Sequence, residues 1–302
     1  MGELEFSPTD PDRLAVIFPT QTKASLVRPS NKQILKEFEV PCCVETMAFS
    51  PEGVFLAVSA GYKVKIFNTK SFKLQKLFST GPMKLKGPEA LSYSSGGKYL
   101  ASGYEDGLIQ VFKPRSSQHV MTRSIQNKDG DKRQGTDVVD LQFLPSQNSQ
   151  KRKLLTLTLG NEVTFWDTRK WQPETTVSLP PDTAPTTYDP NKFISSFSAS
   201  DLEISPDGNI AIVSNDRDIL VISISQRKII QRIDNAHKFS VTTVSFSPSG
   251  KFFVSGGEDS PNKPGQAVIK LWKNPYYEES PGQRKDTGGK IPPGQSGNSK
   301  KN

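Results

Sequence analysis

Two histidines, His119 and His237, and two adjacent cysteines, Cys42 and Cys43, are the side chains of this 302-residue chain best suited to acid-base, nucleophilic or metal chemistry. Hydrolysis or group transfer needs a nucleophile beside a base, and zinc needs Cys and His ligands at short, regular spacings. The cysteines have no histidine and no second cysteine pair at such a spacing. The sequence therefore predicts no catalytic residue and no metal site.

Several carboxylates fall where the chain is expected to turn. Asp is favoured in turns because its side chain hydrogen-bonds to nearby backbone, so turn formation accounts for these residues. The segment "GGED" at 256–259 ends an expected strand and opens no helix, unlike a phosphate-binding loop. We expect no cofactor, no small-molecule substrate and no enzymatic activity. The turn carboxylates are Glu105, Asp106, Asp216, Asp218, Glu258 and Asp259.

The elements that would position these residues repeat along the chain. Six copies of one phrase occur: "LEFSP" at 4, "MAFSPEG" at 47, "LSYSSGG" at 91, "LQFLPSQ" at 141, "LEISPDG" at 202 and "VSFSPSG" at 244. The residue that precedes each turn serves as a marker, and successive markers are 43, 44, 50, 61 and 42 residues apart. A period in the low forties is typical of propeller blades and not of helical solenoids. The markers are Phe6, Phe49, Tyr93, Phe143, Ile204 and Phe246.

Each repeat contains further segments rich in β-branched and aromatic residues, separated by turn residues. A second and a third strand follow the marker in every repeat, for example "FLAVSA" and "KVKIFNT" in the second. A fourth follows in five repeats: "QILKEFEV", "LQKLFST", "HVMTRSI", "ETTVSLP" and "KIIQRID". Sheets of four strands must stack face to face to bury their apolar sides, which predicts an all-β propeller with six blades.

These repeats resemble the WD-repeat family, whose units read "V..V.FSP.G..LASG..D..I..W", over about residues 2 to 274. The resemblance implies a β-propeller that binds other proteins as a non-catalytic scaffold. It also implies a hydrogen-bonded chain of side chains that fixes a blade, matched best in the last repeat by His237, Ser255, Asp259 and Trp272.

The last repeat has no obvious fourth strand. Two alternatives follow: a six-bladed ring with a weak seam, closed partly by "YYEES" at 276–280, or an open ring that awaits a strand from another chain. Residues 275–302 are rich in Pro, Gly, Ser and Lys, which is typical of a disordered tail. We therefore expect a propeller over residues 1–274 and a disordered tail over 275–302.

The net charge of +8 admits an anionic partner such as RNA or a ribonucleoprotein, although a solvated basic surface is the commoner explanation. The basic clusters fall in expected loops. The candidate RNA contacts are Lys128, Lys132, Arg133, Lys151, Arg152 and Lys153.

Two segments are candidate protein-binding elements. Trp166, Asp167 and Arg169 form a W-D-x-R pattern that resembles the box of cullin-4 ligase substrate receptors, although the same pattern is frequent in ordinary blades. The long connection at 180–200 carries Tyr188, Phe193 and Phe197, and aromatic residues are favoured at binding hot spots. A further alternative is nucleotide exchange on a small GTPase, because "AHKFSVTTVSFSPSG" is similar to the last blades of an exchange factor of the endoplasmic reticulum.

The compartment is inferred from composition. Two neighbouring cysteines cannot form the framework of a small secreted domain, and neither a signal peptide nor an apolar run long enough to cross a bilayer is recognisable. We expect a cytoplasmic or nuclear protein without membrane insertion that binds other proteins within a larger complex.

Overall fold

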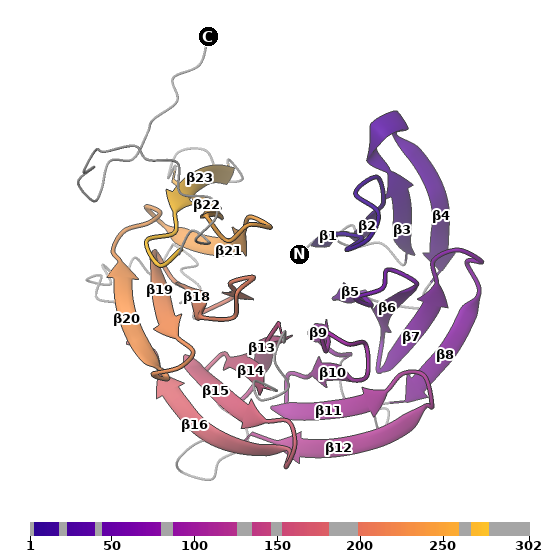
Figure 1. The fold of residues 1–302 in the computed structure, drawn as a ribbon, viewed down its shortest axis with the longest axis horizontal. Helices are drawn as coiled ribbons and strands as arrows, with labels where there is room; N and C mark the ends of the chain where they lie inside the picture. Colours follow the sequence, from indigo (N-terminus) through magenta and orange to yellow (C-terminus); the bar gives the residue numbers. More distant parts are fainter. Residues whose placement is uncertain are drawn as a thin grey trace, which may run out of the picture.

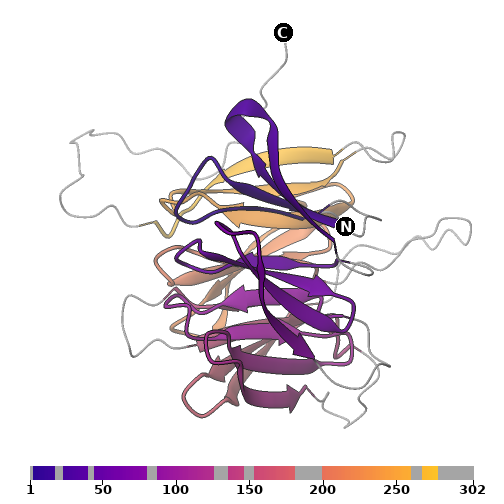
Figure 2. The ribbon, with the colours of Figure 1, turned by 90° about the vertical axis from the view of Figure 1, so that its right-hand side faces the viewer.

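A computed structural model describes residues 3–17, 23–39, 44–79, 87–125, 135–145, 153–180, 199–259 and 267–277. Over these ranges the chain forms six antiparallel sheets arranged around a common centre (Figure 1). Seen from its side, the molecule is a disc one blade deep (Figure 2). Five sheets have four strands and, over the described residues, the sheet of blade six has three. The predicted all-β propeller of six blades is confirmed.

The strands run in chain order within each sheet. Blade one contains β1 (Glu3–Phe6), β2 (Leu14–Ile17), β3 (Lys23–Arg28) and β4 (Gln33–Glu39), with the short 3-10 helix η1 (Pro29–Asn31) between the last two. Blade two contains β5 (Met47–Phe49), β6 (Phe55–Ala60), β7 (Lys63–Asn68) and β8 (Leu74–Ser79). Blade three contains β9 (Ala90–Tyr93), β10 (Leu100–Gly103), β11 (Leu108–Lys113) and β12 (Gln118–Ser124).

Blade four contains β13 (Val138–Phe143), β14 (Lys153–Thr158), β15 (Glu162–Asp167) and β16 (Gln172–Ser178). Blade five contains β17 (Leu202–Ile204), β18 (Ile210–Asn215), β19 (Asp218–Ser223) and β20 (Lys228–Ile233). The described part of blade six contains β21 (Ser240–Phe246), β22 (Phe252–Glu258) and β23 (Ala267–Lys273).

The repeated phrase forms the turn between the first two strands of a blade. In blade two the N–H of Gly53 donates to the carbonyl oxygen of Ser50 (2.8 Å), and the N–H of Phe55 donates to the Ser50 hydroxyl (3.0 Å). Gly250 and Ser247 make the same turn in blade six. Gly53 and Gly250 have φ of 66° and 74°, a region that costs glycine little, which explains the glycine of the phrase. Equivalent turns occur at Ser94 and Ser205.

The apolar core lies between blades. Five clusters of buried side chains join blade one to two, two to three, three to four, four to five, and five to six. A closed ring of six blades would have a sixth cluster, and among the described residues none joins blade six to blade one. The ring is open between these two blades, as the interruption between β1–β3 and β21–β23 at the top of Figure 1 shows.

The division of the chain into a propeller over residues 1–274 and a tail over 275–302 stays a prediction. The sheets extend to Lys273, close to the expected limit at residue 274. Residues 278–302, which include most of the expected tail, lie outside the described residues.

Candidate functional site: the open side of the ring

Strand β23 has one covered face and one uncovered face. Val268, Lys270 and Trp272 are half-buried on the side that packs toward blade five, whereas the alternate residues Ile269 and Leu271 are exposed. The third strand of blade five, β19, is buried at every position. Because neighbouring blades cover both faces of β19, the difference shows that nothing described covers the outer face of blade six.

The uncovered face of blade six is apolar. Ile269 and Leu271 are 76% and 68% exposed, and the Cα partner of Leu271 on β22 is Val254. Phe252 lies on the same face of β22 and is also exposed. A contiguous apolar patch of this kind on a protein surface marks an interaction site.

The opposite wall of the opening belongs to blade one. Phe6 pairs with Leu14, Leu14 with Val27, and Val27 with Ile34, so the four side chains form one row across the sheet. Phe6 and Ile34 at the two ends of the row are 59% and 58% exposed, and Leu4 on the same face is 68% exposed. The other face of blade one packs against blade two. Both walls of the opening therefore present apolar side chains.

The outer edge of β23 is the second open feature. In each of the other blades a fourth strand pairs with the third, as β20 pairs with β19, but no strand pairs with this edge in the described part of blade six. Tyr276 and Tyr277, from the segment proposed as a closing strand, lie in a turn, and Tyr276 packs against the cluster between blades five and six. Residues 278–280 of that segment lie outside the described residues.

Inner strands are linked by side chains that accept backbone N–H groups from the next blade. The N–H of Phe49 donates to Oε2 of Glu5 (3.0 Å), and the N–H of Ile204 donates to Oε1 of Gln142 (2.7 Å). Glu5 and Gln142 each directly precede the marker residue of their repeat. The equivalent residue of blade six, Ser245, is exposed and accepts no such bond within the described ranges.

Three carboxylates gather where blades four, five and six meet. Asp140 accepts from the N–H of Leu202 (2.8 Å), and Asp201 accepts from the N–H of Val244 (2.7 Å). Burial, together with the neighbouring Asp201 carboxylate, raises the pKa of Asp140 well above its usual value and that of Glu203 to about 7. Burial also raises the pKa of Asp201. Each aspartate joins its blade to the next, so the cluster has a structural role.

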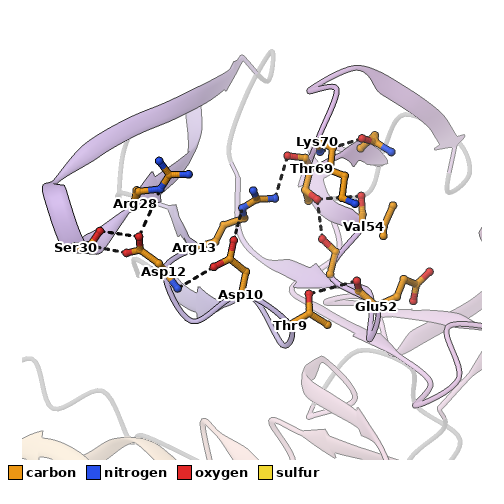
Figure 3. A network of polar contacts seen from close by, with 12 residues as sticks. Thr9, Asp10, Asp12, Arg13, Arg28, Ser30, Glu52, Val54, Thr69 and Lys70 are labelled. Carbon is orange, nitrogen blue, oxygen red and sulfur yellow. Dashed lines mark hydrogen bonds and ion pairs between the residues drawn. The ribbon is translucent and has the colours of Figure 1, made fainter.

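Blade one is attached to blade two by a polar network at the ends of their strands (Figure 3). The guanidinium of Arg13 donates to the backbone oxygen of Thr69 (3.3 Å), and the Thr9 hydroxyl donates to the backbone oxygen of Glu52 (3.4 Å). Asp12 accepts from the Ser30 backbone N–H (2.9 Å) and hydroxyl (2.6 Å), and these bonds lower the pKa of Asp12. This network holds blade one on its blade-two side, while Leu4, Phe6 and Ile34 stay exposed on the face toward the opening.

The four residues of the expected hydrogen-bonded chain come together in blade six. The indole N–H of Trp272 donates to the Ser255 hydroxyl (2.9 Å), and Nε2 of His237 lies 2.8 Å from the same oxygen. Nδ1 of His237 lies 3.2 Å from the carboxylate of Asp259, which also pairs with Lys270 (2.9 Å). Burial is the main cause that lowers the pKa of His237, followed by the charge of Lys270. His237 thus lies in the blade interior as part of the fold.

The W-D-x-R segment contributes mainly to blade four. Trp166 is buried in the core between blades three and four, and its indole N–H donates to the Thr156 hydroxyl (3.0 Å). Asp167 accepts from the backbone N–H of Arg169 (2.7 Å) and shapes the turn that follows β15. Of the three residues, only Arg169 has an exposed side chain.

The remaining candidate contacts are only partly described. Tyr188, Phe193 and Phe197 lie outside the described residues. So do Lys128, Lys132, Arg133, Lys151 and Arg152 of the basic clusters. Lys153 begins β14, where its ammonium pairs with the carboxylate of Glu174, and Arg227 contacts the same carboxylate (2.8 Å). Lys153 is therefore engaged within the fold.

His119 lies in β12, where Nε2 is 2.7 Å from the Thr122 hydroxyl. Across the described residues, no three His, Cys, Asp or Glu side chains are grouped closely enough to hold a metal ion. A search of the same residues finds no helix that could span a membrane.

The apolar walls of the opening were not among the residues predicted as a site. The available signal was the composition of "AVIKLWK", which is apolar on both faces and lacks a following fourth strand. The sequence alone does not show which faces neighbouring blades cover.

Comparisons with known proteins agree with this geometry. The family described as WD domain, G-beta repeat matches residues 85–113, which end with β11, and residues 228–260, which run from β20 to just after β22. The chain is 26% identical over 244 residues to the serine-threonine kinase receptor-associated protein of Dictyostelium discoideum, covering 72% of this chain and 75% of that protein. The six antiparallel sheets form a β-propeller, and two segments of it are similar to the WD repeat.

Proposed function

We propose that this protein is a non-catalytic scaffold subunit that holds other proteins in a larger complex. The observation that carries the proposal is the open side of the ring, where Phe6, Ile34, Ile269 and Leu271 present apolar surface from two blades. Rigid frameworks with exposed apolar patches bind other macromolecules and gain free energy by burying that surface.

The similarity to a kinase-receptor-associated protein supports the same role in general terms. The name of that relative describes association with another protein. An identity of 26% does not transfer its partner, so the proposal concerns protein binding and not a particular receptor. We place the protein in the cytoplasm or nucleus, because its two cysteines are adjacent and form no spaced disulfide framework.

Affinity purification of the full chain from its own cells tests the proposal. The purification is carried out at low salt, at high salt, and after nuclease treatment. Protein partners that survive high salt and nuclease are expected, because apolar contacts do not depend on phosphate charge. Loss of every partner after nuclease would contradict the scaffold function and favour a ribonucleoprotein role through the net charge of +8.

The two finer alternatives give different results in the same experiment. Recovery of cullin-4 ligase components would support a receptor role for the W-D-x-R segment, tested by Arg169→Ala because Arg169 is the exposed member. Enrichment of a small GTPase that depends on its nucleotide state would favour an exchange factor. We favour the general scaffold, because Trp166 is buried and Asp167 is committed to a turn.

A further inference from the structure

The composition of blade six does not match its surroundings. Strand β23 carries Val268 and Trp272 on the face toward blade five and Ile269 and Leu271 on the opposite face. A strand that is apolar on both faces is typical of a sheet covered on both sides, as β19 is. In blade six one of these faces is exposed. Its apolar composition suits a buried face, but no described residue of this chain covers it.

The wall of blade one shows the same mismatch. Its row of Phe6, Leu14, Val27 and Ile34 crosses all four strands, and an edge-to-edge apolar row is the pattern by which blades pack. In blade five the corresponding surfaces lie inside the clusters shared with blades four and six. Both walls are therefore built as blade-to-blade interfaces.

The printed residues beyond the described fold are unsuited to this place. Residues 279–302 contain a single aliphatic side chain, Ile291, among many Gly, Pro, Ser and Lys residues. Gly and Pro are depleted in the interior of sheets, and one aliphatic residue cannot cover two apolar walls. Residues 279–302 therefore lack the composition that such a cover requires.

We propose that the opening receives a β-sheet segment from a partner protein, apolar on both faces, which occupies the position of a seventh blade. The inference rests on the proposed scaffold function and specifies its partner. One face of the segment packs on Val254, Ile269 and Leu271, and the other packs on the row from Phe6 to Ile34. Its strands are near-continuous β-branched and aliphatic runs, because neither face meets solvent.

Polar residues at the inner and outer ends of the opening indicate which polar groups the partner segment carries. At the centre, Ser245 occupies the position from which other blades accept an N–H group of the next inner strand, so the segment donates a backbone N–H there. Lys273 is exposed at the end of β23, on the same face as Leu271, and an acidic residue beside it would complete the contact.

Site-specific photo-cross-linking tests the proposal in the full chain. A photoreactive benzoylphenylalanine replaces Leu271, and a matched control carries it at Leu77, which is 49% exposed on β8 and lies away from the opening. The proteins are irradiated in their own cells, and the linked residues are mapped by mass spectrometry. We expect a product between position 271 and a partner segment that reads as a continuous apolar strand, absent from the control.

A second experiment introduces a charge on the opposite wall of the opening, in blade one. Phe6→Asp, made in the chain with the probe at 271, should reduce this product about tenfold or more, because an interface hot spot is worth that much in affinity. Leu77→Asp in the same background should leave it unchanged. The melting temperature of each variant shows that the ring is folded, since Phe6 and Leu77 are already exposed to solvent.

Several outcomes would overturn the inference. A link from position 271 to blade one of the same chain would indicate a closed ring, and a link to residues 278–302 would indicate a covering tail. A link between a tagged and an untagged copy would indicate a homodimer. The same product from position 77 would indicate a non-specific surface, and no product would indicate an unoccupied face. If the partners found by affinity purification also bind Leu271→Asp, the scaffold function stands and the seventh-blade position fails.

A synthetic peptide with the mapped partner sequence completes the test. Added to the purified chain, it should compete with cross-linking at position 271 and bind Phe6→Asp about tenfold or more weakly. Equal binding to the wild type and Phe6→Asp would show that the segment does not lie between the two walls, and would contradict the proposal.

Discussion

Blades five and six contain the same kind of third strand in different surroundings. In blade five, β19 lies between β18 and β20 and is buried at every residue. In blade six, β23 has one neighbouring strand and alternates between half-buried and exposed residues. Both strands are mainly apolar, so the difference arises from what packs on them and not from their composition. Over the described residues, blade six therefore lacks the neighbours that bury blade five.

The largest expected difference between the blades comes from truncating a core residue. Ile222 of β19 is fully buried in the cluster between blades four and five. Ile222→Ala should lower the free energy of unfolding by about 2 to 5 kcal/mol, because it removes buried methyl groups and leaves a cavity. Chemical denaturation monitored by tryptophan fluorescence measures this. A loss below about 1 kcal/mol would mean that blade five is not packed as described.

The polar chain of blade six gives the next largest effect. Ser255→Ala removes the hydroxyl shared by the Trp272 indole and the His237 ring, and leaves both buried groups without their partner. We expect a loss of about 2 to 3 kcal/mol in unfolding free energy. Ser245→Ala is the matched control, because Ser245 is exposed, and should change stability by less than about 0.5 kcal/mol. Equal effects of the two variants would contradict the role given to Ser255.

The carboxylates at the junction of blades four to six give a pH-dependent effect. The folded protein raises the pKa of Glu203 from the ordinary 4.5 to about 7, so between these values it binds a proton more readily than the unfolded chain. Its contribution to stability is therefore full below pH 4.5 and falls as the pH rises towards 7. Glu203→Gln should remove this fall and make the protein about 1 to 2 kcal/mol more stable than wild type at pH 8.

Unfolding of wild type and Glu203→Gln at pH 4.5, 6 and 8 measures this difference. Comparing the two proteins at each pH cancels the contributions of carboxylates that lie away from Glu203, and leaves those of Glu203 and its neighbours Asp140 and Asp201. A difference that stays constant over the range would show that Glu203 titrates at its ordinary pKa.

The smallest effect is expected on the open side of blade six. Leu271→Ala should change the unfolding free energy of the isolated protein by no more than about 0.5 kcal/mol, because the side chain is 68% exposed. The same measurement as for Ile222→Ala applies. A loss as large as that of Ile222→Ala would show that Leu271 is covered in the free chain, and would remove the distinction between the two blades.

The sequence predicted much of the fold, because turns and strands are locally encoded. The Ser and Gly residues of the repeated phrase form the expected turns, such as that of Ser50 and Gly53. The three-stranded sheet in the described part of blade six also agrees with the prediction, which found no obvious fourth strand after "AVIKLWK". The residues implied by the WD-repeat resemblance, from His237 to Trp272, lie within hydrogen-bonding or ion-pairing distance of one another.

The candidate site was not predictable in the same way. Phe6 and Leu14 look like ordinary strand residues, and their exposure depends on the absence of a neighbouring blade. Trp166 attracted attention as part of a short motif, but tertiary packing buries it. Exposure is a property of the assembled ring, so local patterns cannot separate a covered blade face from an uncovered one.

Residue-resolved amide hydrogen exchange on the isolated monomer tests the central claim most directly. Every N–H of β19 lies between two strands, whereas alternate N–H groups of an edge strand point to solvent. The account predicts uniform protection along β19 and alternating protection along β23, with every second amide exchanging at nearly the rate of an unstructured peptide. Uniform protection of β23, equal to that of β19, would show that the chain completes blade six by itself and would contradict the three-stranded blade.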